Sequence, residues 1–301
     1  MVDFRIGVVG LPGKWSTEVL ADAFKRRTGL RTVIDMESVC LDLSKRNLLW
    51  GNTNLCEYDA LVVKKIAREY SPNVLDRLEL LRIAEGNGVK VFSGAEKILR
   101  LIDRLSCTVS LVNAGIPMPQ TVVTEDPDKA FDTVMEYGQA VFKPLYSTKA
   151  RGMCVIDASV DKKKIRKSIR QFHAANPMMY IQKKMELHGR DFGMVFLGGR
   201  YLGSYARVTK SDSWNTTIFH GGKYMEYEAT PELIELGQRA QAPFGMDFTT
   251  VDVAITEQGP IVFEVSAFGG FRGADEGIGI DVAGLYADYV VQQLQGASDA
   301  A

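Results

Sequence analysis

The chain has 301 residues, of which 46% are hydrophobic and 24% charged, and its formal net charge is −1. This length predicts one large α/β body or two to three subdomains rather than a single small core. The near-zero net charge argues against bulk electrostatic binding to nucleic acid or to an anionic membrane, and the 3 His residues leave little scope for a His-based zinc centre.

The first 95 residues alternate strands with helices, a pattern typical of a parallel, doubly wound sheet. The turn Gly10–Gly13 after the first strand resembles a Walker loop, but Val8 stands where that motif needs a glycine, so a tight strand-to-helix turn is the preferred interpretation. Strands are expected at residues 4–9, 31–35, 59–63 and 89–92, and helices at 16–27 and 74–86.

Residues 96–113 carry apolar side chains close to a 3.6-residue period, which predicts one helix that ends before Gly115 and Pro117. Strands at 121–123, 139–143 and 153–156 and helices at 127–137 and 162–173 follow. A strand at 179–182 is expected to open a third, antiparallel segment, with strands at 191–197, 200–208, 249–255 and 260–265 and a last helix at 282–294. The boundaries predicted from this pattern are 1–95, 96–178 and 179–301.

The four cysteines have no CxxC spacing, which favours idle thiols in a reducing compartment. The N-terminus does not read as a signal peptide, and no stretch approaches the ~18 apolar residues of a membrane span. These features predict a cytoplasmic location. The cysteines are Cys40, Cys56, Cys107 and Cys154.

Charge is distributed unevenly along the chain. Residues 143–170 hold nine basic side chains against two acids, whereas residues 225–301 hold thirteen acids against two arginines and have a net charge of −11. Two solvated faces would explain this distribution. A cationic lobe that faces an anionic lobe, with a polyanion and a metal between them, would explain it equally.

Two apolar strands near the C-terminus each carry one acid. If Ile255 pairs with Ile261, then Asp252 lies directly opposite Glu264, and Ser266 follows on the same face. Like charges at opposed positions are destabilising, so the pair calls for a cation, and oxygen ligands select Mg²⁺. The alternative is an exposed face on which both acids point into water.

Lys143 ends an apolar strand and precedes a polar loop, residues 147–152, that contains Lys149 and Arg151. Small and basic residues beside a strand end suit phosphate binding. A strand lysine that merely reaches solvent is the commoner case.

Taken together, Lys143, Asp252 and Glu264 give the chain a resemblance to the ATP-grasp superfamily, in its RimK-type branch of carboxylate–amine ligases, over almost the whole length. The run GFRG at 270–273 is similar to that of the methanopterin and coenzyme F420 glutamate ligases. The chain also resembles the GAK-system subgroup of ATP-grasp enzymes, to which it could instead be assigned. The matching stretches are IDRL (102–105), AGIPMP (114–119), AVFKPL (140–145), GRD (189–191), VDV (251–253), VFEV (262–265) and GIDVA (279–283).

The resemblance implies an α/β architecture: a parallel-sheet pre-ATP-grasp domain (1–95), followed by a two-lobed α+β ATP-grasp fold (96–178 and 179–301) that clamps ATP. It implies a reaction in which ATP phosphorylates a carboxylate and an amine displaces the acyl phosphate to form an amide. The implied partners are ATP and a small-molecule or peptide carboxylate with an amine such as glutamate, without nucleic acid or membrane. A homo-oligomer is also expected, since family members often self-associate.

The resemblance also implies roles for individual residues. The phosphoryl group or the substrate carboxylate would meet Arg207 and Arg272, and Mg²⁺, or Mn²⁺ in its place, would be held by Asp252, Glu264 and Ser266. The nucleotide would be bound by Arg104, Lys143, Lys149, Arg151, Asp191 and the hinge Gln182, Lys183, Lys184 and Met185.

Several positions depart from the family pattern, and the phosphate loop is less rich in glycine than usual. The departures support two hypotheses: a ligase with a shifted substrate, or an ATP-binding regulatory or scaffold protein with little or no ligase turnover. They are Arg104 in place of Lys, Lys183 in place of an acid, Gly193 in place of Arg, Thr217 in place of Asn and Ser266 in place of an Asn ligand.

Overall fold

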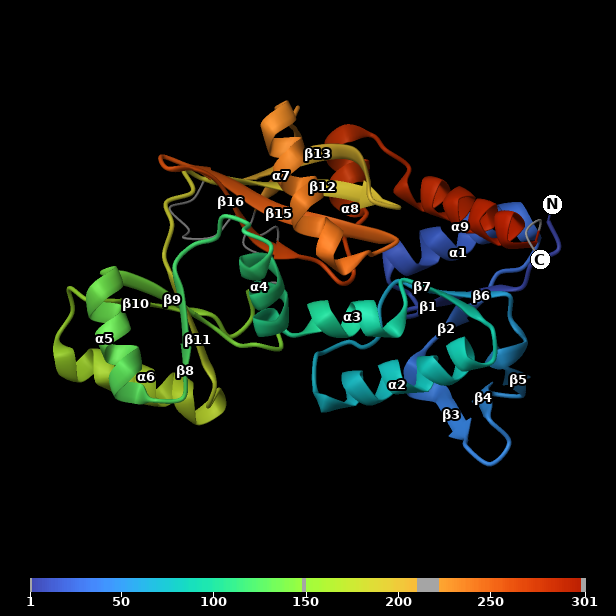
Figure 1. The fold of residues 1–301 in the computed structure, drawn as a ribbon, viewed down its shortest axis with the longest axis horizontal. Coiled ribbons are helices and arrows are strands. Elements are labelled where there is room, and N and C mark those ends of the chain that lie inside the picture. The colour runs from blue at the N-terminus through green and yellow to red at the C-terminus, as the bar shows by residue number, and fades with distance from the viewer. Residues whose placement is uncertain (1, 148–149, 210–221, 299–301) are drawn as a thin grey trace.

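The computed structural model of the chain describes residues 2–147, 150–209 and 222–298. Within them the strands form four sheets, three large and one small. The C-terminal sheet lies beside both the N-terminal and the central sheets, which stand apart from each other (Figure 1). Among these residues no helix combines the length and the apolar character that a bilayer-crossing segment needs.

The N-terminal sheet is parallel, as the alternating pattern predicts. Its order is β2 (Val33–Ile34), β1 (Ile6–Val9), β6 (Ala60–Val63) and β7 (Lys90–Phe92). One face packs on α2 (Pro72–Gly86) through side chains such as Leu61 and Leu78. The other face packs on α1 (Trp15–Thr28), where Leu20 and Phe24 are buried.

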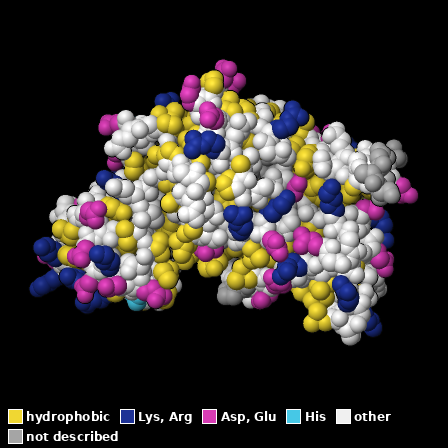
Figure 2. All heavy atoms as spheres, viewed as in Figure 1, with side chains coloured by type: hydrophobic (Ala, Val, Ile, Leu, Met, Phe, Trp, Pro, Cys, Tyr) yellow, Lys and Arg dark blue, Asp and Glu magenta, His cyan; other side chains and the backbone are white. Residues whose placement is uncertain are grey.

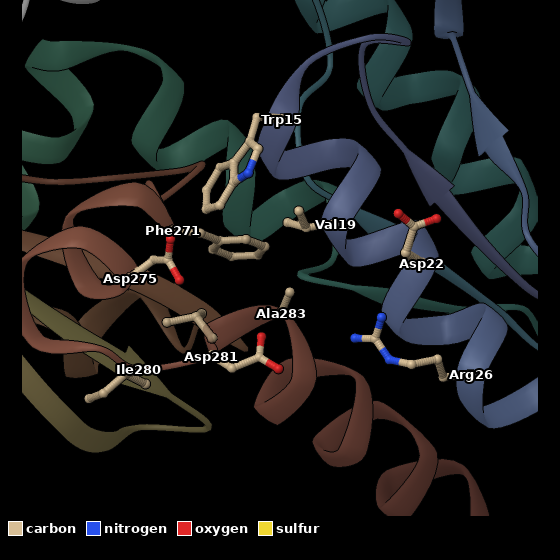
Figure 3. Close-up of a pocket in the computed structure, with 10 residues that line it drawn as sticks. Trp15, Val19, Asp22, Arg26, Phe271, Asp275, Ile280, Asp281 and Ala283 are labelled. Carbon is tan, nitrogen blue, oxygen red and sulfur yellow. The ribbon is translucent and has the colours of Figure 1, made fainter.

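The helix at the C-terminal end of the described chain, α9 (Val282–Ser298), returns to this first sheet and lies alongside α1 (Figure 1). Tyr286 and Val290 are buried against α1 and the sheet. A cavity of about 190 Å³ lies where α1 meets the start of α9, with Trp15 and Phe271 on its walls (Figure 3). The first and last parts of the chain therefore share one hydrophobic core.

A small antiparallel sheet that the sequence analysis did not anticipate lies between β2 and β6. It consists of β3 (Val39–Asp42), β4 (Asn47–Trp50) and β5 (Thr53–Asn54). Short strands of this kind carry too few residues for a clear alternation of apolar and polar side chains. Single 3-10 turns lie at Met36–Ser38, Leu55–Glu57 and, later in the chain, Ala242–Phe244.

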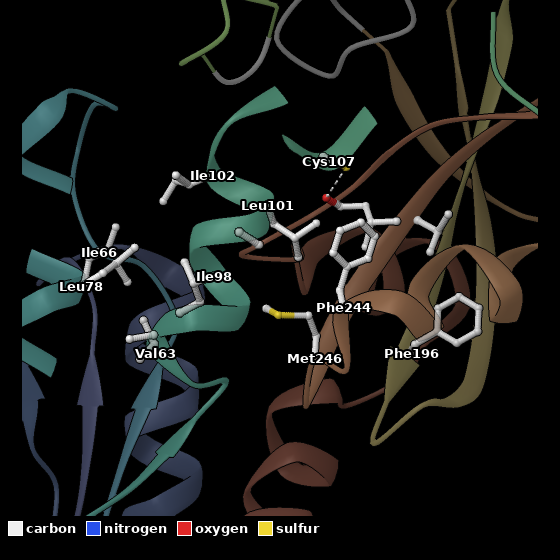
Figure 4. Close-up of a cluster of buried hydrophobic side chains, with 14 of the residues drawn as sticks. Val63, Ile66, Leu78, Ile98, Leu101, Ile102, Cys107, Phe196, Phe244 and Met246 are labelled. Carbon is white, nitrogen blue, oxygen red and sulfur yellow. Dashed lines mark hydrogen bonds between the residues drawn. The ribbon is translucent and has the colours of Figure 1, made fainter. Parts of the chain in front are cut away.

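The single helix predicted at 96–113 is two helices, α3 (Ala95–Ile102) and α4 (Arg104–Asn113). Asp103 causes the break, because its carboxylate accepts a hydrogen bond of 3.0 Å from the Leu105 N–H and so caps α4. The apolar period continues through the break: Ile98 and Leu101 of α3 and Cys107 of α4 belong to one core, which joins the N-terminal and C-terminal sheets (Figure 4).

The central sheet is antiparallel, in the order β10 (Cys154–Asp157), β9 (Gln139–Lys143), β11 (Met179–Lys183) and β8 (Thr121–Thr124). The strand at 179–182, predicted to open the C-terminal segment, belongs instead to this central sheet. It is β11, and Ile181 holds it in this sheet by packing in the core of α5 (Pro127–Tyr137) and α6 (Lys162–Ala175). Figure 2 shows Lys and Arg side chains gathered at this end of the molecule.

The C-terminal sheet is antiparallel, as predicted. Its order is β14 (Lys223–Glu226), β13 (Arg200–Val208), β12 (Arg190–Leu197), β15 (Phe248–Thr256) and β16 (Gly259–Val265). On one face, α7 (Pro231–Gln241) packs against Met194 and Phe196. The other face carries the polar side chains described below, and α8 (Arg272–Ile278) lies at its edge against Tyr205.

Candidate functional site

A cavity of about 760 Å³ lies where the central sheet, the C-terminal sheet and the loop after β6 meet. Most of the residues predicted to bind nucleotide, metal or substrate line it. Lys149 and Thr217 lie outside the described residues. Arg151 is exposed beside Glu69, 3.5 Å away, and is not among the lining residues. The predicted residues that line the cavity are Arg104, Lys143, Gln182, Lys183, Lys184, Met185, Asp191, Arg207, Asp252, Glu264, Ser266 and Arg272.

The two opposed acids on the β15–β16 hairpin are confirmed. Asp252 pairs directly with Glu264, although the pairing used to predict this is off by one residue, since Ile255 pairs with Pro260. The register shifts between Asp252 and Val253, where Phe263 is the extra residue on the partner strand. This β-bulge restores the opposition of the two acids near the cavity.

Arg207 joins two of the cavity carboxylates. It lies opposite Asp191 on the neighbouring strand, and its Nε and Nη2 donate to the two carboxylate oxygens of Asp191 at 3.0 and 2.6 Å. The same Nη2 is 3.1 Å from Oδ2 of Asp252. Burial raises the pKa of Asp252 to about 6, with Arg207 acting against the shift and Glu264 adding to it.

Arg104 contacts the second acid, Glu264. It is the first residue of α4, only 8% of its side chain is exposed, and its Nη1 lies 3.1 Å from Oε2 of Glu264. Its Nε donates to the carbonyl of Pro144 at 3.3 Å, and its guanidinium lies over the ring of Tyr180. Each of the opposed acids therefore contacts a largely buried arginine, although Arg207 is shared between Asp252 and Asp191.

The donor set suits a hard cation that keeps other ligands. The chain offers two carboxylates, Asp252 and Glu264, and the hydroxyl of Ser266 in the same cavity. No cluster of three or more His, Cys, Asp or Glu residues able to hold a metal occurs in residues 2–147, 150–209 and 222–298. Mg²⁺ commonly binds one or two carboxylates together with substrate phosphates and water, so these residues fit it as part of a shared site.

Lys143 is buried at the end of β9, where its Nζ donates to Oε1 of Gln182 at 2.5 Å. Burial lowers the pKa of Lys143 to about 7, Arg104 lowers it further, and Glu264 opposes both. Gln182 is held in turn, because its amide nitrogen donates to Thr121 Oγ1 at 3.1 Å. An anion that entered the cavity would favour the charged form of this lysine.

The predicted hinge is the end of β11 and the residues after it. The backbone N–H groups of Lys183 and Lys184 donate to Gln120 and Gln139 within the protein, at 2.8 and 2.9 Å. Those two donors are therefore used by the fold. Met185 lines the cavity beyond the end of the strand.

Gly193 is explained by Tyr205, a residue that the sequence analysis did not single out. The two pair across β12 and β13, and a Cβ on Gly193 would lie 2.4 Å from Cζ of Tyr205. Gly273 approaches the same ring, because its Cβ would lie 2.2 Å from it. The tyrosine ring thus fills the space in which a side chain at position 193 would stand.

Arg272 reaches the cavity from α8. Its Nη1 is 3.3 Å from Oε1 of Glu276, and its guanidinium lies 5.0 Å from the ring centroid of Trp15. Trp15 is the first residue of α1, directly after the turn that the sequence analysis interpreted as a tight strand-to-helix connection. That turn places an aromatic side chain against a predicted site arginine.

The cationic segment divides between site and surface. Lys143 faces the cavity, whereas Lys162, Lys163 and Lys164 at the start of α6 are exposed. The basic side chains of this segment thus lie in two places, with Lys143 at the cavity and the three lysines of α6 on the surface.

Sequence reasoning did not assign Lys65, Tyr70 and Phe268, which are among the other residues that line the cavity. Lys65 follows the carboxyl end of β6, and ligands of open α/β sheets bind outside the carboxyl ends of the strands. The pair of lysines after a buried parallel strand was the available signal.

Comparison with known proteins matches residues 102–290 to the family model described as the RimK-like ATP-grasp domain. The tetrahydromethanopterin:α-L-glutamate ligase of Methanosarcina acetivorans is 24% identical, over 97% of this chain and 98% of its own length. The ribosomal protein bS6–L-glutamate ligase of Salmonella schwarzengrund is 24% identical, over 95% of each chain.

Solved structures share the fold. The ATP-grasp ligase PsnB complexed with its minimal precursor has a TM-score of 0.75 at 19% identity and covers 97% of this chain and 100% of its own. A RimK domain ATP-grasp protein of Sphaerobacter thermophilus has a TM-score of 0.74 at 21% identity, over 95% and 98%. The ATP-grasp architecture predicted from the sequence is confirmed.

Proposed function

Since this chain belongs to the RimK-like ATP-grasp family, and is thus an ATP-dependent carboxylate–amine ligase, we propose that it joins the amine of L-glutamate to a carboxylate of a peptide or small molecule. The relatives that are glutamate ligases support glutamate as the amine, and the PsnB precursor complex supports a peptide. The observation that carries the proposal is the cavity in which the opposed acids Asp252 and Glu264 share walls with Lys143.

The reaction has two steps that balance. An oxygen of the substrate carboxylate attacks the γ-phosphorus of ATP, the bond from phosphorus to the bridging oxygen breaks, and ADP leaves. The amine nitrogen then attacks the acyl carbon, the carbon–oxygen bond to phosphate breaks, and the amine proton passes to solvent as the amide forms. Phosphoryl transfer of this kind depends mainly on positioning and on neutralised charge.

The cavity residues suit those needs. Lys143 and Arg104 would place positive charge on the phosphates from the central sheet and from α4, and Arg207 and Arg272 would meet the transferring phosphoryl group or the substrate carboxylate. Mg²⁺, or Mn²⁺ in its place, would be held by Asp252, Glu264 and Ser266 and would neutralise phosphate charge. The hinge, from Gln182 to Met185, would border the adenine. We place this chemistry in the cytoplasm, where ATP is available and the four free thiols stay reduced.

The test is a ligation assay with purified protein, Mg²⁺-ATP, L-glutamate and a panel of peptides and small carboxylic acids. We expect ADP release that requires both the amine and the carboxylate, and a product whose mass corresponds to a new amide. ADP release that needs neither, or no ADP release across the panel, would contradict the proposal. ATP binding without turnover is the result that the regulatory or scaffold hypothesis predicts.

A further inference from the structure

The loop between β6 and α2, residues 64–70, forms a third wall of the cavity and comes from the N-terminal sheet. Two of its side chains, Lys65 and Tyr70, line the cavity together with Phe268, which follows the metal-ligand strand β16. None of these residues belongs to the predicted nucleotide or metal site. The wall therefore faces a region of the cavity that the nucleotide and metal residues leave unassigned.

The loop is anchored to both ATP-grasp lobes. Lys64 is buried, and its Nζ donates to the carbonyl of Gly269 at 2.7 Å and lies over the ring of Phe271 at 4.4 Å. At the other end of the loop, Glu69 lies 3.5 Å from Arg151 of the central lobe. The loop therefore contacts both lobes, through the buried Lys64 on one and through an exposed ion pair on the other.

The lining side chains combine a cation with apolar rings. The Nζ of Lys65 is 3.0 Å from Tyr70 Oη, 4.4 Å from the centroid of the Tyr70 ring and 5.0 Å from that of Phe268. The two rings meet edge to face with their centroids 6.3 Å apart. An ammonium group held between aromatic rings at a cavity wall suits an anion whose neighbouring atoms are methylene groups.

The wall is also close to the reacting end of the site. Burial raises the pKa of Tyr70, and the charge of Glu264 adds to this rise, which reflects how near the loop lies to the metal carboxylates. Phe268 comes two residues after Ser266 along the same chain segment. We assign the phosphates to Lys143 and Arg104, neither of which belongs to this loop, and therefore assign the third wall to the second substrate.

We propose that Lys65, Tyr70 and Phe268 form the subsite for the side-chain carboxylate of a dicarboxylic amino acid that reacts through its amine, with Lys65 pairing with that side-chain carboxylate. The rings of Tyr70 and Phe268 pack against its methylene groups. This inference rests on the proposed ligation of L-glutamate and assigns Lys65 as the residue that selects an acidic over a neutral amino acid.

The test measures steady-state kinetics of the full-length protein with L-glutamate and with L-glutamine, for wild type, Lys65→Met and Lys65→Arg. A lost charge-assisted contact predicts that Lys65→Met raises KM for L-glutamate by about tenfold to a hundredfold. The preference for glutamate over glutamine falls by the same factor, while kcat and the Kd of ATP stay within about twofold. Lys65→Arg restores most of the preference.

Lys45→Met is the matched control. Lys45 lies in the same N-terminal part of the chain, 73% of its side chain is exposed, and its Nζ lies 3.7 Å from Oδ2 of Asp42. Ligase activity in wild type with an unchanged KM in Lys65→Met overturns the subsite and leaves the proposed function standing. A kcat loss without a change in preference also overturns it, since that is the result of a purely structural role.

A binding measurement decides the inference even if wild type forms no amide. L-glutamate and L-glutamine are each titrated into protein that is saturated with Mg²⁺ and a non-hydrolysable ATP analogue. Thermal stabilisation by glutamate alone, lost in Lys65→Met and kept in Lys45→Met, supports the subsite. Equal responses to the two amino acids, or none, overturn it.

Discussion

Asp252 lies directly opposite Glu264 across one hairpin, and each of the two carboxylates is bound by an arginine from a different part of the chain. Two acids at opposed positions repel each other, and the arginines offset that repulsion. Both arginines also line the cavity. The repulsion between the two acids is thus reduced in the absence of ligands, although Arg207 also pairs with Asp191.

Changing Glu264 to Gln should weaken Mg²⁺-dependent ATP binding while the fold survives. The amide keeps an oxygen that can accept from Arg104, but it removes the charge that attracts a cation. We expect the affinity for ATP in Mg²⁺ to fall at least about tenfold, as loss of groups around a metal commonly does. Isothermal titration with and without Mg²⁺ measures this effect.

Glu257→Gln is the control for that measurement. Glu257 is exposed in the turn of the same hairpin, away from the cavity lining. It should bind ATP as wild type does. An identical Mg²⁺ dependence in Glu264→Gln and wild type would refute the metal assignment.

ATP binding should take up a proton above neutral pH, because burial lowers the pKa of Lys143 to about 7 and phosphates favour its charged form. As pH rises through and beyond this value, the affinity should fall by up to about tenfold per pH unit. Lys143→Arg stays charged in this range and should show neither effect. Calorimetry in two buffers of different ionisation enthalpy, above about pH 7.5 where phosphate is fully ionised, measures the proton uptake.

Lys143 should also make the free energy of unfolding increase with pH. Its folded-state pKa lies below its ordinary value of 10.5, so between about pH 7 and 10.5 the unfolded chain holds more protons, and the free energy of unfolding rises with pH. In Lys143→Met this contribution to the rise is absent. A constant difference in unfolding free energy between the two proteins across that range would contradict the assignment.

Gly193→Ala should destabilise the protein by about 1–3 kcal/mol, the usual cost of overpacking. The new Cβ would lie 2.4 Å from the Tyr205 ring, and Gly273 also approaches this ring so closely that a Cβ there would lie 2.2 Å from it. Denaturant midpoints measure the loss. Tyr205→Leu in the same chain should relieve most of it, and full additivity of the two changes would show that the ring is not the cause.

Gly296→Ala is the control for Gly193→Ala, because it should raise the stability of the protein rather than lower it. Gly296 lies in α9, and a Cβ there has nothing within 4 Å. Alanine is preferred over glycine inside a helix by about 1 kcal/mol, so this variant should be slightly more stable than wild type.

Trp15→Leu should loosen Arg272 and raise KM for the carboxylate or amine substrate by about two- to fivefold, in keeping with the energy of a partly exposed cation–π contact. The salt bridge to Glu276 remains, so kcat should change less than KM. Trp15→Phe keeps an aromatic face and should recover part of the loss. Equal behaviour of Leu and Phe variants in the steady-state assay would show that the ring does not position the arginine.

Much of the fold followed from local pattern. The alternation of strands and helices predicted the parallel N-terminal sheet, and the helix at Pro127–Tyr137 and the strand at Gln139–Lys143 have the bounds expected of them. These features depend on period, caps and turn residues that lie within a few positions of one another. The break at Asp103 was not predicted, because the apolar period continues from one helix into the next even though Asp103 caps a new helix there.

The sequence by itself indicated that Asp252 and Glu264 lie on paired strands, because side chains in a hairpin alternate with a period of two, but the bulge at Phe263 that sets the two acids opposite each other was shown only by the tertiary structure. The sequence also determined that Lys143 ends a buried strand. Only the tertiary structure decided which side chains lie beside these charged groups. Arg104 approaches Glu264 across 160 positions of sequence, and Lys65 reaches the same cavity from the first sheet. Such contacts arise where separate layers pack together, and no local period encodes the approach of one layer to another.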